Sequence, residues 1–392
     1  MGTTLPSAEE EVWRYSRIGD LDLSRWEAPP PSTPAAAAPP SDLTSTAALL
    51  VDVVDGAVTV SDLPAGWAGE GVVIAPASTL DEAQAGLGTV AGDGPDLFAT
   101  YNDAFTDDPV VITVPRGVSL VGPIVVRTHL TASGRAAFGR LVVRLGEGAE
   151  AEVLAVQTSG DDPVLSVPLV ELDLARGARL RYLDVQDLGH QAWQLGSLTA
   201  RIGQEADLTA GLVGLGGEYA RIRTDCRLAG RGANGDLLAA YFGEARQMLD
   251  FRTFQHHDAP DTTSNLLFKG AVAGHSRSVY TGLIRVDKAA RGTNAFQTNR
   301  NVKLSDTAWA ESVPNLEIET NDVRCSHAST VGPVDPEQRF YLESRGVPPR
   351  TADRLIVAGY FDEVVRQLPV PSVVAALGTR FADKLDRVEV VS

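Results

Sequence analysis

The chain has 392 residues, of which 44% are hydrophobic and 22% are charged, a balance typical of a folded protein and not of a disordered one. Its 34 basic and 51 acidic residues give a net charge of −17, which repels phosphate backbones and anionic membrane surfaces, so nucleic acid is not expected as a partner. The two cysteines, Cys226 and Cys325, lie far apart and outside any C-x-x-C motif. Neither a disulfide framework nor a structural zinc site is therefore expected.

The beginning of the chain is acidic where a signal peptide would have a basic start and an apolar stretch. The most apolar early run, residues 47–60, is interrupted by Asp52, Asp55 and Gly56 and is too short to span a membrane. With so few cysteines, these features predict a soluble protein of the reducing cytoplasm.

The N-terminal region, residues 1–108, is expected to form a small α/β cap preceded by a helix and a linker. Residues 7–27 are predicted to form a short acidic helix, and residues 28–41 contain six prolines, which predict a stiff and extended linker. From residue 48 to about residue 100, short apolar runs alternate with a helical stretch near residues 80–87.

Residues 109–334 are a long series of short segments in which apolar and polar residues alternate, each followed by a polar turn with glycine. Four of the turn segments can be superimposed, with starts 29, 26 and 29 residues apart: Gly148, Gly177, Gly203 and Gly232. Two further steps of 29 residues reach Asp261 and Ala290. Repeats of this length that contain only strands predict a parallel β-helix, right-handed by the usual crossover chirality. A large antiparallel β-sandwich is the alternative, although its turns would recur about every 8 to 12 residues.

Residues 335–392 are predicted to form a C-terminal helical domain. Asp335 is a candidate N-cap that is followed by Pro336, and Gly346 would end this first helix. A second helix is expected over residues 351–367, and a third begins at Ser372 with one apolar stripe along it. The fold class is therefore mainly β, with a parallel β-helix core between a small α/β region and a helical domain.

Two motifs that suggest ligand binding also have structural explanations. Residues 230–235 fit G-x-G-x-x-G, but a predicted strand follows where a dinucleotide site needs a helix, so these glycines are interpreted as a repeat turn. His256, His257 and Asp258 are metal-ligand types, but adjacent residues of a strand point to opposite faces, which favours a polar rung or turn. The chain has no G-x-x-x-x-G-K-[ST], H-E-x-x-H or G-x-S-x-G motif.

Cys325 and His327 form a more specific candidate site. Residues two apart on a strand share a face, so the thiol and the imidazole would lie side by side, and a thiolate beside an imidazole is a soft-metal pair. The alternative is that Val323 and Cys325 face the interior of the β-helix while His327 satisfies a turn.

From about residue 264 to residue 368, the chain resembles the SufB/SufD family of iron–sulfur cluster assembly proteins. The matching residues are 268–270, 278–282, 304–305, 314–318, 321–332 and 340–346, together with Ala290, Thr293, Gln297, Asn299 and Asn301. SufB-type chains carry a cysteine about thirty residues upstream of the segment that matches 325–330, whereas this chain has no cysteine in residues 297–301. They also have Glu-His-Glu where this chain has Cys325, Ser326 and His327. The sequence is therefore more similar to SufD.

This resemblance implies a scaffold subunit and not an enzyme. It implies that the β-helix pairs with that of SufB, that the C-terminal helices recruit the ATPase SufC, and that ATP is hydrolysed by SufC. A nascent, transient iron–sulfur cluster shared with SufB would be the cargo, and His327 corresponds to the SufD histidine at that interface, with Cys325 as a further candidate ligand. The alternatives are a SufB-like or homodimeric cluster scaffold and, more remotely, a carbohydrate-active β-helix protein, which the low aromatic content of 6% disfavours.

Overall fold

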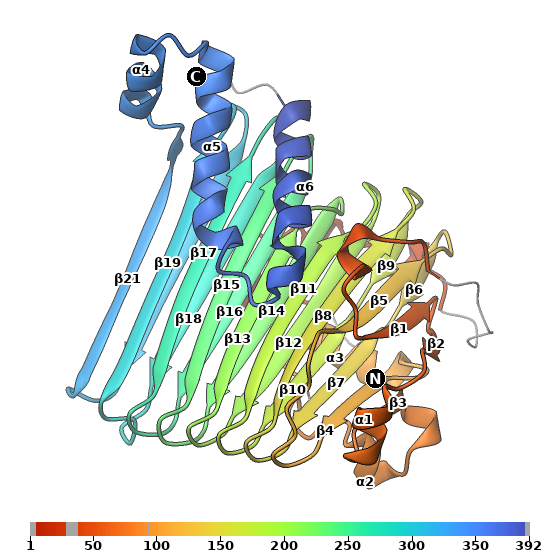
Figure 1. The fold of residues 1–392 in the computed structure, drawn as a ribbon. Coiled ribbons are helices and arrows are strands. Elements are labelled where there is room, and N and C mark those ends of the chain that lie inside the picture. Colours follow the sequence, from red (N-terminus) through yellow and green to blue (C-terminus); the bar gives the residue numbers. More distant parts are fainter. Residues whose placement is uncertain (1–4, 29–37, 93, 389–392) are drawn as a thin grey trace.

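The computed structural model describes residues 5–28, 38–92 and 94–388, and most of them wind into a long coil made of two facing β-sheets (Figure 1). The first sheet has ten strands in the order β2 (Ala57–Val60), β1 (Leu49–Val54), β5 (Ile124–Leu130), β8 (Glu150–Ser159), β11 (Arg179–Asp187), β13 (Asp207–Gly214), β15 (Asn234–Gly243), β17 (Thr263–Val272), β19 (Thr293–Lys303) and β21 (Val323–Pro333).

The second sheet has eleven strands. Its main order is β20 (Trp309–Ile318), β18 (Arg277–Val286), β16 (Met248–His257), β14 (Tyr219–Leu228), β12 (Trp193–Ile202), β10 (Leu169–Leu174), β7 (Arg140–Leu145), β4 (Val110–Val114) and β3 (Val73–Pro76), with β6 (Arg135–Ala137) and β9 (Val164–Ser166) beside it. Among the described strands, the pairs β1/β2 and β3/β4 are antiparallel, and the pairs that build the coil are parallel. The predicted parallel β-helix is confirmed, and the antiparallel sandwich is excluded.

Side chains along a strand of the coil alternate between two buried faces, the interior of the coil and its covered outer face. In β15, Leu237 and Tyr241 belong to the interior core of the coil, whereas Leu238 and Phe242 belong to a second apolar cluster on the outer face, under the C-terminal helices. A strand covered on both faces is apolar at nearly every position, which is typical of parallel sheets.

The turns between coils repeat a left-handed backbone position, although not at every predicted residue. The residues that occupy it, with positive φ, are Gly148, Gly177, Glu205, Gly232, Asp261 and Gly292. Gly232 and Asp261 lie where the spacing predicted, whereas Gly203 and Ala290 do not, because the true positions are Glu205 and Gly292. Gly203 is required for a different reason, since a Cβ there would lie 2.6 Å from the carbonyl oxygen of Leu174 in the preceding coil.

The N-terminal segment lies on the outer face of the second sheet. The single acidic helix predicted for residues 7–27 is wrong, because the segment forms three short 3-10 helices, Glu11–Trp13, Ile18–Asp20 and Leu23–Arg25. Tyr15 has a φ of 64°, which interrupts any longer helix. The side chain of Trp13 is buried in a cluster that includes Trp193 and Tyr219 of the sheet, so the sheet surface determines the path of this segment.

The rest of the N-terminal region combines the β1/β2 hairpin and β3 with short helices. These are a 3-10 helix at Asp42–Thr44, α1 (Ala65–Gly69), a 3-10 helix at Ala77–Thr79, α2 (Glu82–Ala85) and α3 (Leu97–Phe105). Most of the predicted proline-rich linker, residues 29–37, lies outside the described residues.

Three helices follow β21: α4 (Pro336–Ser344), α5 (Pro349–Val365) and α6 (Val374–Arg387), with a 3-10 turn at Pro371–Val373 before α6. Asp335 caps α4 as predicted, because its carboxylate accepts a hydrogen bond from the main-chain N–H of Glu337 at 2.9 Å. Figure 1 shows α5 and α6 side by side over the outer face of the first sheet, where Phe361 and Phe381 stack with ring centroids 4.5 Å apart. Across the described residues, none of the helices has the length and apolar character needed to cross a bilayer.

Candidate functional site

The candidate site lies at the open end of the β-helix, where the last strand of each sheet has a neighbour on one side. In the described residues, β20 pairs with β18 and β21 pairs with β19, and Figure 1 shows β21 at the outer edge of the molecule. The side chains of β21 are exposed or half-buried, whereas alternate side chains of β19 are buried. The free edges of these two strands carry main-chain N–H and C=O groups that are available to another chain.

Cys325 and His327 point to the interior side of the last coil. In the register between β19 and β21, Cys325 pairs with Ala295 and His327 pairs with Gln297, and the side chains of Ala295 and Gln297 are buried inside the coil. Since paired residues of a parallel ladder stack above one another, Cys325 and His327 share the face that the next coil would cover. His327 is exposed, and it lies on a strand and not in a turn.

The environment of Cys325 favours the protonated thiol. The residue is half-buried and packs with Val323 and Leu316 against an apolar cluster that includes Ile284 and Ala295. This burial raises the pKa of the Cys325 thiol, and contact with the main chain of Ala295 opposes the rise only in part. Because metals bind the thiolate, Cys325 would have to lose a proton on binding a metal.

The described residues contain no group of three or more His, Cys, Asp or Glu side chains that converges as a metal site. Cys325 and His327 therefore supply at most two ligands. Iron–sulfur clusters are held by about four protein ligands, so these two side chains alone are too few to hold a cluster.

The predicted polar role is confirmed for His257. The ring nitrogens of His257 lie 2.8 Å from the Thr262 hydroxyl and 3.0 Å from the Ser264 hydroxyl, so both are already engaged inside the coil. Burial, with a smaller effect of the neighbouring His256, lowers the pKa of His257 to about 4. His257 is therefore not available as a metal ligand, because both of its ring nitrogens already form hydrogen bonds.

The structure also places a polar network beneath the site that the sequence analysis did not assign. Tyr241 donates to the side-chain oxygen of Asn301 at 2.8 Å, Asn299 donates to the Tyr241 hydroxyl at 3.1 Å, and Asn301 donates to Asn299 at 2.9 Å. Gln297 continues this row on β19 and lies directly under His327. The signal was present in the sequence, because Gln297, Asn299 and Asn301 occupy alternate positions of one predicted strand.

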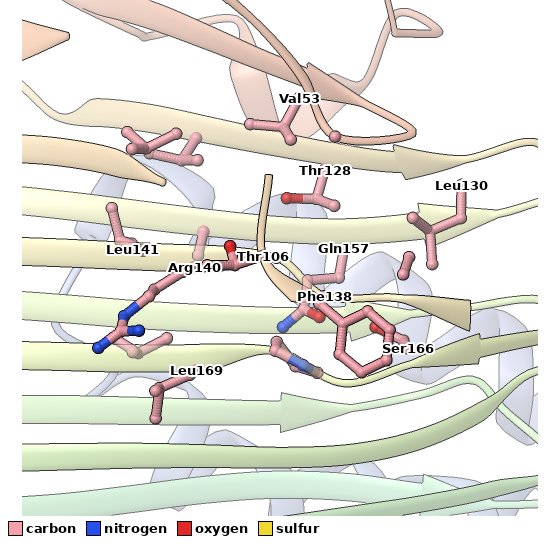
Figure 2. A pocket seen from close by; sticks show the side chains of 18 of the residues that line it. Val53, Thr106, Thr128, Leu130, Phe138, Arg140, Leu141, Gln157, Ser166 and Leu169 are labelled. Atoms are coloured by element: carbon pink, nitrogen blue, oxygen red, sulfur yellow. The ribbon is translucent and has the colours of Figure 1, made fainter. Parts of the chain in front are cut away.

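A separate hollow lies near the other end of the coil and does not belong to this site. Figure 2 shows its wall, with Leu130 and Phe138 as apolar sides and Thr128 and Gln157 as polar groups. Asp184 lies at its polar end, where the amide of Gln157 donates to the carboxylate at 2.8 Å. These residues come from β5, β8, β11 and the segment between β6 and β7, at the opposite end of the first sheet from β21.

Comparison with known proteins assigns the fold and the open end to a family. The family model described as "SUF system FeS cluster assembly, SufBD core domain" matches residues 128–360, which include most of the coil, the open end and part of α5. The chain belongs to the SufBD family. It is thus an iron–sulfur cluster assembly protein of the SUF system, and Cys325 and His327 lie within the matched core domain.

Similar proteins in the SufBD family come from distant organisms. Iron–sulfur cluster assembly SufBD family proteins of Mycobacterium bovis and Mycobacterium tuberculosis are 36% identical over 300 residues, which cover 74% of this chain and 74% of theirs. The chloroplastic protein ABCI7 of Arabidopsis thaliana is 28% identical over 394 residues, covering 94% of this chain and 80% of its own. A SufBD family protein of Staphylococcus epidermidis is 24% identical over 278 residues, covering 70% and 59%. This family membership does not favour the carbohydrate-active alternative.

Proposed function

We propose that this SufBD protein is the SufD-type scaffold subunit of a SUF complex, without catalytic turnover of its own. The observation that carries this proposal is the pairing of Gln297 with His327. SufB-type chains have a cysteine in the segment that corresponds to residues 297–301, and this chain has none there. The site thus offers an exposed imidazole but lacks the cysteine of SufB, which fits a subunit that completes a site on a partner.

The proposed partner at the open end is the β-helix of SufB. The unpaired edges of β20 and β21 and the exposed inward-facing side chains of the last coil form a surface that a second coil would cover. Because His327 is exposed, its imidazole could reach iron that is also bound by the partner. The two ligand types on this chain leave the remaining positions of an iron–sulfur cluster to SufB.

In this arrangement, the nascent cluster is cargo that the complex binds and releases. His327 would bind iron through the lone pair of a neutral imidazole nitrogen. Cys325 is the secondary candidate, because its burial favours the thiol over the metal-binding thiolate.

The proposed SufC contact lies on the C-terminal helices. Phe340, Tyr341 and Leu355 are large side chains of α4 and α5 with exposed fractions of 72%, 58% and 53%. Tyr341 and Leu355 also line a groove between these helices and the ends of β19 and β21. Exposed aromatic and aliphatic side chains beside a groove are typical of a protein contact.

Co-purification with SufB and SufC, followed by iron and sulfide analysis, tests the proposal. His327→Ala is expected to keep both partners and to lose most of the cluster, whereas Cys325→Ser is expected to lose less. Ser329→Ala, two residues further along the same face, is the matched control. Unchanged iron and sulfide in His327→Ala would reject the site, and a stable homodimer that assembles clusters without SufB would favour the homodimeric alternative.

Phe340→Asp and Leu355→Asp test the SufC contact separately. Both are expected to reduce SufC binding without loss of SufB. Deletion of all three helices is a poorer test, because it would expose the apolar cluster around Leu238 and Phe242 on the first sheet. Retention of SufC by both variants would contradict the proposed contact. The predicted localisation of this chain remains the cytoplasm, whereas the relative in Arabidopsis is named as chloroplastic.

A further inference from the structure

Gln255 and Gln297 carry side-chain amides that are buried without a hydrogen-bond partner. Each side chain belongs to a residue that is 1% exposed, and within the described part of the chain neither its amide oxygen nor its amide nitrogen is bonded. Burying an amide without a hydrogen bond costs free energy, so most buried amides in proteins are paired. Two free amides near one end of the coil therefore require an explanation.

The surroundings of Gln297 leave its amide free and keep space for it. Asn299 and Asn301 close their hydrogen bonds with Tyr241 and with each other, and Gln297 takes no part. Across the interior, Gly282 faces Gln297, and a Cβ at this glycine would lie 2.5 Å from the Gln297 amide nitrogen. The glycine thus makes room for an amide that forms no hydrogen bond inside the coil.

The group stacked above Gln297 is the exposed side chain of His327. The two residues are direct partners in the parallel register of β19 and β21, and neighbouring strands lie about 4.8 Å apart. Both side chains point to the interior side of the sheet. Because His327 is exposed, rotation of its side chain would bring a ring N–H toward the Gln297 amide oxygen.

We propose, on the basis of the function proposed above, that Gln297 is a positioning residue for His327. Its amide oxygen Oε1 accepts a hydrogen bond from one ring N–H, and the lone pair of the other ring nitrogen then points out of the coil toward iron. Metal-binding histidines usually donate their second N–H to a carbonyl or carboxylate oxygen, which fixes the ring orientation. Water competes for this hydrogen bond in the free chain, and the covering partner excludes that water.

The tautomer of His327 provides a test that does not depend on cluster yield. The chain, labelled with ¹⁵N-histidine and bound to unlabelled SufB, is examined by solid-state NMR at about pH 8.5, where imidazole is neutral. A His327→Gln variant identifies the signals of His327 among the six histidines. One tautomer is expected to dominate in the unaltered chain, and Gln297→Leu is expected to give a mixture. Gln297→Glu keeps the Oε1 acceptor and is expected to restore the single tautomer.

Gln255→Leu is the matched control, because it removes an equally buried and unpaired amide from a column that ends at Leu316 and not at His327. Both leucine variants are expected to unfold at or above the temperature of the unaltered chain, since each removes an unpaired buried amide. Gln297→Met provides a second test if Gln297→Leu does not fold. Anaerobic titration of the complex with Fe(II) is expected to show an affinity about 10 to 100 times lower for Gln297→Leu alone.

The same tautomer in Gln297→Leu and in the unaltered chain would overturn the proposal, whether or not the affinity for iron changes. An equal effect of Gln255→Leu on the tautomer would also overturn it. These outcomes are independent of the scaffold function, which fails if His327→Ala leaves the cluster content unchanged. A complex that needs His327 but is indifferent to Gln297 would retain the proposed function and reject only this inference.

Discussion

The ammonium group of Lys269 on β17 donates a hydrogen bond to the main-chain carbonyl of Tyr360 on α5, 2.9 Å away. The Lys269 side chain is 1% exposed, and it also forms an ion pair with Glu363 one turn further along the helix. The hydrogen bond from Lys269 lowers the pKa of Glu363, so this carboxylate stays ionised at neutral pH and the pair is lost only in acid. The hydroxyl of Tyr360 donates to the carbonyl of Arg300 at 2.6 Å and fixes the same helix to β19.

Lys269→Met is therefore expected to loosen α5 from the first sheet. The substitution keeps an apolar stem but removes the buried donor, which lowers the free energy of unfolding by about 1 to 3 kcal/mol. Urea unfolding measures this loss, and the SufC contact proposed above is expected to weaken with it. Lys303→Met, at the half-buried end of β19, is the control and should change little. Equal stability of the Lys269→Met and unaltered chains would show that apolar contacts alone hold the helix.

Asp184, buried inside the coil, is expected to reduce stability at neutral and alkaline pH. Burial raises the pKa of Asp184 from 3.8 to about 6, and the hydrogen bond from Gln157 limits the rise. A pKa above its unfolded value means that the contribution to stability is full below about pH 4 and is lost as the pH rises through about 6. Two pKa units correspond to about 3 kcal/mol, which is an upper estimate of the cost of the buried charge at pH 8.

Asp184→Asn should accordingly be more stable than the unaltered chain at pH 8 by about 1 to 3 kcal/mol, with the difference vanishing toward pH 4. Denaturant unfolding across this pH range measures the difference. Asp162→Asn, in an exposed turn, is the control and should give no pH-dependent difference. A destabilised Asp184→Asn at pH 8 would mean that the ionised carboxylate is compensated inside the coil.

His257 is expected to produce the opposite pH dependence. Its pKa is lowered from 6.5 to about 4, so the unfolded chain binds more protons between these values and stability increases with pH across the window. The contribution of neutral His257 to the free energy of unfolding is full above about pH 6.5, and about 2 to 3 kcal/mol of this contribution is lost at pH 4.5. His257→Gln cannot take up this proton, so its stability should depend less on pH between 4.5 and 7. His190→Gln, on an exposed turn, should follow the unaltered chain, and parallel curves for His257→Gln would contradict the assignment.

The strands and the coil were predictable because their pattern is local. Alternation over a few residues, as between Leu237 and Leu238, directly reports the two buried faces of a strand. The cap at Asp335 was predictable for the same reason, since its hydrogen bond reaches only two residues along the chain. The segment around Trp13 was not predictable, because its path depends on the surface of strands about two hundred residues away, which local pattern does not describe.

The candidate site also combines features that local sequence patterns predict with features that depend on distant residues. That Cys325 and His327 share a face follows from their spacing on one strand, and the structure places both on the interior side. That Gln297 lies under His327 depends on the register between two coils. This register varies with the length of each turn, since Thr263 pairs with Asn294 but Thr293 pairs with Val323. Spacing along the sequence alone therefore could not identify the amide beneath the histidine.

In the turn between β12 and β13, the left-handed position falls on Glu205 and not on the predicted Gly203. Two substitutions with opposite effects on stability test this assignment. Glu205 has a φ of 55° at the left-handed position that Gly148 and Gly177 occupy in other turns, and a side chain there costs about 1 kcal/mol or more. Glu205→Gly is therefore expected to raise the free energy of unfolding by about 0.5 to 1 kcal/mol, after the greater entropy of glycine in the unfolded chain is subtracted. Gly203→Ala is expected to lower it by about 1 to 3 kcal/mol, because its Cβ would lie 2.6 Å from the carbonyl oxygen of Leu174. Urea unfolding of both variants measures the two changes in the free energy of unfolding. A stabilised Gly203→Ala together with a destabilised Glu205→Gly would contradict the assignment of the left-handed position to Glu205.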